Sequence, residues 1–197
     1  GAQNGGSITR PAAFCGGAGC KPTFGRVSSA GVMPFAPSLD HPGPIARTVR
    51  DLAILMDAIA GPDERDPLCS PRPAQRLNDA LDKPLDSPPR LALLRGLFWD
   101  QADDAARKML EKTVEKLTAH NVSVREAKLP DSFADVIQSH RVLMSVEAAA
   151  DHEERLALHP ADYLPKIRGL LEEGLRTSAA CYVRAKKPSA MPIRSSS

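Results

Sequence analysis

Between residues 91 and 124, a strand pattern, a helix pattern and a second strand pattern follow one another. Residues 91–94 form a short apolar run after two prolines, which indicates a buried strand. Residues 103–117 place apolar side chains on one side and charged ones on the other, as an amphipathic helix does. Residues 122–124 alternate as a strand again. Two strands joined by a helix are typical of a crossover connection, so we predict an α/β fold with a mixed β-sheet flanked by α-helices.

A further helix signal begins at Thr48. Thr48 and Asp51 form an N-terminal pattern close to a capping box, and Gly61 with Pro62 ends the pattern. Apolar side chains recur at helical spacing and indicate core packing: Val49, Leu52, Ala53, Met56, Ile59 and Ala60. We expect loop, a short strand and turns over residues 1–45, and a long surface connection over 62–89. The remaining helices are expected at 132–157, 162–174 and 178–187.

Composition excludes several classes of function. The net charge is +2, and the basic residues form no stripe with interleaved aromatics, so we expect no nucleic-acid partner. No apolar run approaches the roughly 20 residues of a membrane span, so we expect no membrane partner. The four cysteines lack the paired short spacings of a zinc site. Free thiols in a cytoplasmic protein are the expectation.

A serine directly after two glycines lies near the start of the chain, in Gly5-Gly6-Ser7. The glycines leave the backbone bare, so a substrate can approach it closely. Consecutive N–H groups in such a turn can stabilise an oxyanion while the hydroxyl attacks a carbonyl carbon. A plain turn explains the same three residues equally well. We expect Arg10 to brace this loop through side-chain hydrogen bonds, with contact to a substrate as the alternative.

The longer run resembles the nucleophile segment of the amidase signature family. The resemblance covers residues 1–16, the Lys-Pro-Thr-Phe-Gly-Arg-Val run at 21–27 and residues 36–61, and it continues more weakly over 89–185. It implies a metal-free hydrolase of small-molecule amides that needs no cofactor, and it leaves a homodimer open. It implies that Ser7 is the nucleophile and that the oxyanion donors are the backbone N–H groups of Asn4, Gly5, Gly6 and Ser7.

The family's lysine base and its cis-peptide serine both lie upstream of the nucleophile. This chain starts at Gly1, and Lys21 falls on the Lys-Pro-Thr motif, which does not supply the base. We therefore expect residues 1–187 to be the C-terminal portion of an amidase domain that is nearly silent alone. The alternatives are an inactive remnant or interaction module and a glutamine-type amidotransferase subunit. Pro188 and Pro192 predict the end of the last helix and a disordered tail over 188–197.

Other reactive side chains are assigned structural roles. Asp40 and His41 are adjacent, which does not favour a triad with Ser7, and a turn held by local hydrogen bonds is expected instead. Cys15 is expected to be a buried, inert thiol at the start of a strand. Structural or solvent-exposed roles are expected for the remaining candidates: Ser28, Ser29, Asp63, Asp66 and Asp82.

Overall fold

The computed structural model describes residues 1–189, which divide into two compact units. The first unit combines residues 1–82 with the segment from Gln138 onward, and the second comprises residues 83–137. The α/β class is confirmed. In the described part, the strands pair as three two-stranded ladders, two antiparallel and one parallel. A mixed sheet combines antiparallel and parallel pairing. Both kinds are present here, but in separate ladders.

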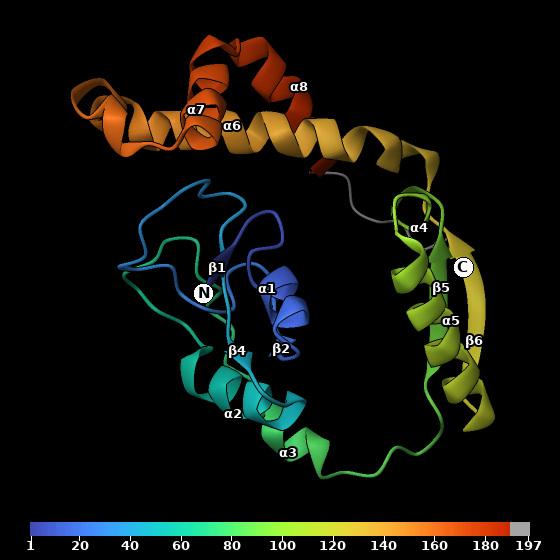
Figure 1. Cartoon of the computed structure of the whole chain (residues 1–197). Coiled ribbons are helices and arrows are strands. Elements are labelled where there is room, and N and C mark those ends of the chain that lie inside the picture. Colours follow the sequence, from blue (N-terminus) through green and yellow to red (C-terminus); the bar gives the residue numbers. More distant parts are fainter. Residues whose placement is uncertain (190–197) are drawn as a thin grey trace. The chain divides into compact units, whose positions relative to one another are not determined.

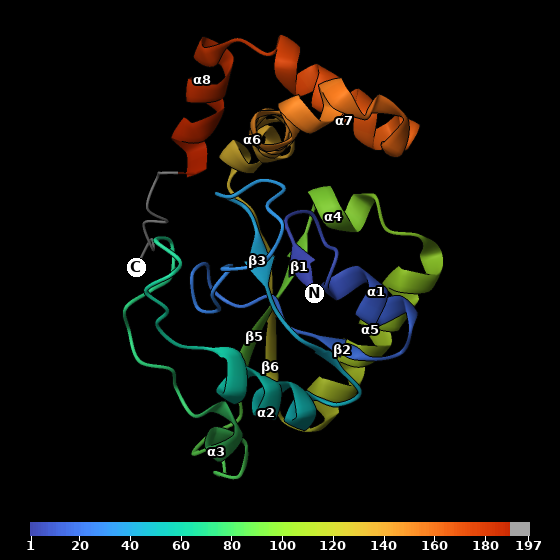
Figure 2. The ribbon, with the colours of Figure 1, turned by 90° about the vertical axis from the view of Figure 1, so that its left-hand side faces the viewer.

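The N-terminal part of the first unit holds two short ladders and three helices (Figure 2). Its elements are β1 (Ala2–Gln3), α1 (Thr9–Phe14), β2 (Ala18–Gly19), β3 (His41–Pro42), β4 (Ile45–Ala46), α2 (Val49–Ile59) and α3 (Leu77–Leu81). Strand β1 pairs with β3 and β2 pairs with β4, both antiparallel. The strand predicted after the serine loop is thus only two residues long, as its small side chains would favour.

Helix α6 is the longest helix of the described chain, and α7 and α8 pack beside it (Figure 1). The bounds are α6 (Val136–Leu158), the 3₁₀ turn η2 (Pro160–Asp162), α7 (Pro165–Arg176) and α8 (Ala179–Ser189). One apolar cluster joins α6 to α8 through Leu143 and Ala185. A second joins α6 to α7 through Ala148 and Leu171, with Phe35 packed against it. The loop that carries Phe35 is therefore anchored on α6 and α7.

The second unit contains the predicted crossover. Its elements are β5 (Arg90–Arg95), α4 (Leu97–Asp100), α5 (Asp104–Ala119), β6 (Ser123–Lys128) and the 3₁₀ turn η1 (Asp131–Asp135). Strands β5 and β6 are parallel, with Arg90 opposite Ser123 and Arg95 opposite Lys128. The expectation that β5 is buried is wrong, since none of its residues is buried. The two helices of this unit, one of them only four residues long, are too few to cover both faces of a parallel ladder.

Two helix boundaries differ from the sequence prediction. Helix α1 lies inside the segment expected to be loop and turns. Pro11 suggests a break there, but a proline in the first helical turn removes an N–H group that needs no intrahelical partner. Helix α8 continues through Pro188 to Ser189, two residues past its predicted end at residue 187. Residues 190–197 of the expected tail lie outside the described residues.

The capping box predicted for α2 is confirmed. The Thr48 hydroxyl accepts a hydrogen bond from the Asp51 N–H at 3.1 Å, and the Asp51 carboxylate accepts one from the Thr48 N–H at 3.2 Å. Both bonds satisfy donors that the first turn of a helix leaves free. We therefore expect Thr48→Ala to lower the free energy of unfolding by about 1 kcal/mol. Urea denaturation measures this loss, and Thr48→Ser, which keeps the hydroxyl, should retain most of the stability.

Asp66 has the structural role of the two roles expected for it, and it is buried rather than solvated. Only 7% of it is exposed, and its carboxylate accepts hydrogen bonds from the Ser29 N–H at 2.7 Å, the Ser29 hydroxyl at 2.9 Å and the Leu68 N–H at 2.9 Å. The hydrogen bond from the Ser29 N–H lowers the pKa of Asp66 most. The hydrogen bond from the Leu68 N–H has the next largest lowering effect. Ser29 is structural, as expected, because it anchors this carboxylate.

This anchor predicts an acid-dependent stability. A carboxyl group whose pKa is lowered in the folded state stabilises the fold fully above its ordinary value near 3.8, and that contribution is lost as the pH falls through the folded pKa. We expect Asp66→Asn to destabilise the chain at neutral pH and the difference from the unmutated chain to shrink below about pH 4. Urea denaturation across a pH series measures it. Glu64→Gln, two residues away and exposed, should leave the difference near zero at every pH.

Candidate active site

Ser7 lies in the turn that leads into α1. Gly6 has a φ of +108°, a conformation that side chains other than glycine rarely adopt, and its carbonyl accepts a hydrogen bond from the Arg10 N–H at 2.9 Å. Ser7 is exposed, whereas the next residue, Ile8, is fully buried. The buried isoleucine and the left-handed glycine thus fix the turn on both sides and leave the serine at the surface.

Gln3 holds the start of α1 from outside the helix. Its side chain is buried, and its Oε1 accepts hydrogen bonds from the Ile8 N–H at 2.8 Å, the Thr9 N–H at 3.0 Å and the Thr9 hydroxyl at 3.3 Å. Sequence reasoning missed this residue, because common capping patterns place the acceptor at the first helical boundary and not five residues before it. Gln3 thereby satisfies the donors that follow Ser7.

The donors before and at Ser7 remain free. Within residues 1–189, the backbone N–H groups of Asn4, Gly5, Gly6 and Ser7 donate to no hydrogen bond. The Ser7 hydroxyl likewise has no hydrogen-bond partner in the described part of the chain, so no lysine or histidine there contacts it as a base. Unpaired N–H groups beside an exposed hydroxyl are the arrangement that stabilises a developing oxyanion.

Asn4 is fixed from two elements distant in sequence. The Asn4 carbonyl lies 2.7 Å from Nε2 of His140, on α6, and its side-chain amide donates to Asp40 Oδ1 at 3.4 Å. The other Asp40 oxygen accepts hydrogen bonds from the N–H groups of Phe35 and Ala36, at 2.8 and 3.1 Å. Asp40 therefore ties the serine turn to the loop that carries Phe35.

His41 takes part in its own turn. Its Nδ1 lies 2.6 Å from the Leu39 carbonyl, and its ring packs edge-on against Phe24. Neither Asp40 nor His41 hydrogen-bonds to Ser7 in the described residues. The geometry thus gives Asp40 and His41 the turn role expected from the sequence, and no triad with Ser7.

A cavity of about 380 Å³ opens beside Ser7. Its polar lining consists of Gln3, Asn4, Ser7 and Asp40. Its apolar lining comes from β1, the loop before Asp40, α6 and α7: Ala2, Met33, Phe35, Met144, Ile167 and Leu170. All of these residues belong to the first unit. A small molecule in this cavity can reach the serine hydroxyl.

The sequence and structure were compared with known proteins. Residues 1–180 match the family model described as Amidase. The chain belongs to the amidase family. The resemblance drawn from the serine turn and the segments after it is thereby confirmed.

Two curated relatives illustrate the range of the family. One component of the glutamyl-tRNA(Gln) amidotransferase of Thermus thermophilus is 42% identical over 151 residues, which cover 77% of this chain and 31% of the relative. AtzE, a component of the 1-carboxybiuret hydrolase of a Pseudomonas species, is 35% identical over 188 residues, covering 95% of this chain and 40% of the relative. The chain thus spans about a third of the length of the curated relatives it matches.

Solved amidase structures share the fold. A structure of a vestigial protein complex, described as revealing the evolutionary origins of an s-triazine catabolic enzyme, aligns with a TM-score of 0.84 at 33% identity, covering 94% of this chain and 39% of that one. The peptide amidase of Stenotrophomonas maltophilia aligns with a TM-score of 0.73 at 28% identity, covering 96% of this chain and 43% of that one.

The surroundings of Arg10 and Cys15 differ from expectation. Arg10 makes no side-chain hydrogen bond within residues 1–189, and instead its side chain lies across Gly6, where an added Cβ would come within 2.8 Å of Arg10 Nε. Cys15 is exposed rather than buried, because it ends α1 instead of beginning a strand. Helix formation in this segment therefore changes the surroundings of both residues.

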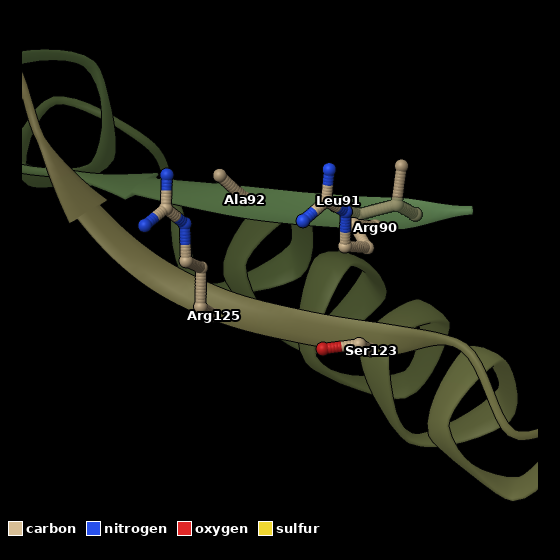
Figure 3. A pocket seen from close by; sticks show the side chains of 5 residues that line it. All are labelled: Arg90, Leu91, Ala92, Ser123 and Arg125. Atoms are coloured by element: carbon tan, nitrogen blue, oxygen red, sulfur yellow. The ribbon is translucent and has the colours of Figure 1, made fainter. Parts of the chain in front are cut away.

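A second cavity belongs to the other unit. It has a volume of about 380 Å³ and is lined by Arg90, Leu91, Ala92, Ser123 and Arg125. Figure 3 shows both guanidinium groups on the same side of the β5–β6 ladder. No ion pair involves either arginine in the described structure, and Ser123 has no base beside it.

Among residues 1–189, no group of three or more His, Cys, Asp or Glu side chains is placed to hold a metal ion. The helices of that same part are all too short or too polar to cross a membrane.

Proposed function

We propose that Ser7 is the acylating nucleophile of an amide hydrolase. The observation that carries the proposal is the exposed, unpartnered Ser7 hydroxyl with four free backbone N–H groups at and before it. Membership of the amidase family supports the same chemistry. The substrate is a small-molecule amide, which the cavity beside Ser7 can accommodate.

The reaction proceeds in two steps. Ser7 Oγ attacks the amide carbonyl carbon while a base accepts the hydroxyl proton, and the resulting oxyanion accepts hydrogen bonds from the N–H groups of residues 4–7. The C–N bond then breaks, and the amine leaves with the proton from the base. Water attacks the ester on Ser7, the acid is released and the hydroxyl is restored. Each lost oxyanion donor would raise the barrier by about 3–4 kcal/mol.

We propose that the base is supplied from outside residues 1–189, where no lysine or histidine hydrogen-bonds to Ser7. We propose that residues 1–187 form the C-terminal portion of the amidase domain. The four free cysteines support a cytoplasmic location, since oxidising compartments favour disulfides. We also propose that the protein forms a homodimer, and its mass measured by analytical sedimentation tests this.

A component of a glutamine-dependent amidotransferase is the second candidate. Its support is the 42% identity to the Thermus thermophilus relative. This function uses the same Ser7 chemistry but passes ammonia to a second protein. Release of ammonia from glutamine, with none from simple amides, would favour this candidate over a hydrolase.

Covalent labelling tests the role of Ser7. A fluorophosphonate probe is applied to the chain and to a chimera in which residues 1–187 replace the matching segment of the Pseudomonas relative, which supplies the rest of an amidase domain. We expect rapid labelling of the Ser7 peptide in the chimera and slow labelling in the chain alone, as peptide mass spectrometry would show. A folded chimera without label on Ser7 would support an inactive remnant and overturn the proposal.

A further inference from the structure

His140 joins the long helix α6 to the serine turn. Its Nε2 lies 2.7 Å from the Asn4 carbonyl oxygen, and a Cβ added to Gly5 would lie 3.8 Å from its Cε1. A carbonyl oxygen only accepts hydrogen bonds, so Nε2 carries the proton of this contact. The His140 side chain is half-buried and does not line the cavity beside Ser7. It therefore holds the turn without entering the space that a substrate would occupy.

Helix α6 gives this contact a fixed base. Leu143, about one helical turn after His140, is buried in a cluster with Ala185 of α8. Arg141, the residue next to His140, donates two hydrogen bonds to the carboxylate of Glu173 on α7. The backbone of His140 is thus held from two neighbouring helices, and its imidazole ring has a fixed point of attachment.

The peptide group between Asn4 and Gly5 carries the effect of this contact to a backbone donor. The described residues contain no cis peptide bond, so the Asn4 carbonyl and the Gly5 N–H point in opposite directions from one rigid plane. The hydrogen bond from His140 directs the carbonyl toward α6 and hence the Gly5 N–H away from it. A hydrogen bond to the carbonyl also polarises the peptide group and strengthens its N–H as a donor.

We infer that His140 is a positioning residue of the proposed reaction, because it holds the Asn4 carbonyl so that the Gly5 N–H stays directed at the developing oxyanion. The inference rests on the proposed function for the oxyanion and on the 2.7 Å contact for the geometry. An oxyanion gains much more from such a donor than a neutral substrate carbonyl does. Loss of the His140 donor should therefore lower turnover and leave KM nearly unchanged.

Two substitutions separate the hydrogen bond from the shape of the ring. His140→Phe keeps a planar ring and removes the donor, whereas His140→Gln keeps an N–H donor at similar reach and removes the ring. If His140→Phe does not fold, His140→Leu removes the donor without a ring. His159→Phe is the matched control, because this exposed histidine directly follows α6 and does not line the cavity.

A nuclear magnetic resonance measurement tests the contact in the full chain without any reaction. Asparagine is followed by glycine only once in the sequence, at residues 4–5. Labelling with ¹³C at the asparagine carbonyl and ¹⁵N at glycine therefore gives a single correlation, from the Asn4 carbonyl carbon to the Gly5 N–H. Accepting a hydrogen bond deshields a carbonyl carbon. We expect His140→Phe to move the carbon signal upfield, His140→Gln to return it most of the way and His159→Phe to leave it in place.

The chimera used for labelling tests the effect on the reaction. We expect His140→Phe to slow fluorophosphonate labelling of Ser7 and to lower kcat for a simple amide, each by about 10- to 100-fold. This loss is smaller than the roughly 10²–10³-fold that removal of a whole oxyanion donor costs. KM should change by less than about twofold. His140→Gln should recover both rates to within about fivefold of the original, and His159→Phe should match the original.

Three results would overturn the inference: an unmoved Asn4 carbon signal in folded His140→Phe, equal rates in the original and His140→Phe chimeras, or no recovery in His140→Gln. These results are distinguishable from failure of the proposed function. Absence of label on Ser7 in the folded original chimera would reject the proposed chemistry, and the role of His140 in it. Label on Ser7 with unchanged rates in His140→Phe would retain the proposed chemistry and reject only the inference.

Discussion

Ser7→Ala is expected to abolish fluorophosphonate labelling and to lower the turnover of simple amides by the chimera roughly 10⁴–10⁶-fold, as loss of a nucleophile does in other serine hydrolases. The hydroxyl is the only group at this position that can form the acyl-enzyme. Because Ser7 is exposed and its hydroxyl has no hydrogen-bond partner within residues 1–189, its loss should leave the melting temperature unchanged. Ammonia release and thermal denaturation measure the two quantities.

Ser28→Ala is the matched control. The Ser28 hydroxyl accepts a hydrogen bond from the Ala30 N–H at 3.1 Å, in a turn that does not line the cavity beside Ser7. Turnover and labelling of this variant should equal those of the unmutated chimera. Residual turnover in Ser7→Ala above a hundredth of the original would assign the nucleophile elsewhere.

Gly174→Ala is expected to destabilise the first unit by about 3 kcal/mol. Gly174 is buried where α7 crosses α6, and an added Cβ would collide with the Ser145 carbonyl and lie 2.7 Å from the Ala149 Cβ. Ser145 is itself fully buried, so neither helix can yield without separating from the other. The change should also disturb the cavity beside Ser7, since Ile167 and Leu170 of α7 line it.

Gly169→Ala provides the comparison on the same helix. A Cβ at Gly169 would meet nothing within 4 Å, and alanine favours helix by about 1 kcal/mol over glycine. We expect this variant to be as stable as the original chain or more so. Both tyrosines, Tyr163 and Tyr182, lie in the first unit and the single tryptophan, Trp99, in the second. Tyrosine circular dichroism and tryptophan fluorescence can therefore follow the units separately, and equal stability of both glycine variants would contradict the close crossing.

Local sequence signals predicted the elements that depend on local forces. The capping box of Thr48 and Asp51 fixed the start of α2, and the strand–helix–strand pattern predicted the parallel β5–β6 ladder. Both depend on contacts within a few residues or on the period of apolar side chains. The serine turn was found in the same way, because two glycines before a serine form a short contiguous motif.

The features that sequence reasoning missed or left open have a different origin. Helix α1 was missed because its first donors are satisfied by Gln3, which lies outside the helix and gives no local capping signal. The burial of Asp66 depends on Ser29, 37 residues earlier in the chain. The exposed Cys15 follows from the missed helix. The Gln3 contact spans only five residues but matches no common capping pattern, whereas the Asp66 contact joins segments that no short window of sequence contains.

The sequence by itself determined the family and the identity of the nucleophile candidate, because both rest on contiguous residues. Only the tertiary structure decided what surrounds Ser7: which N–H groups stay free, which side chains wall the cavity and which single charge faces it. Much of that wall comes from side chains of α6 and α7, which lie far from Ser7 along the chain. Packing of distant helices, and not local preference, sets these surroundings.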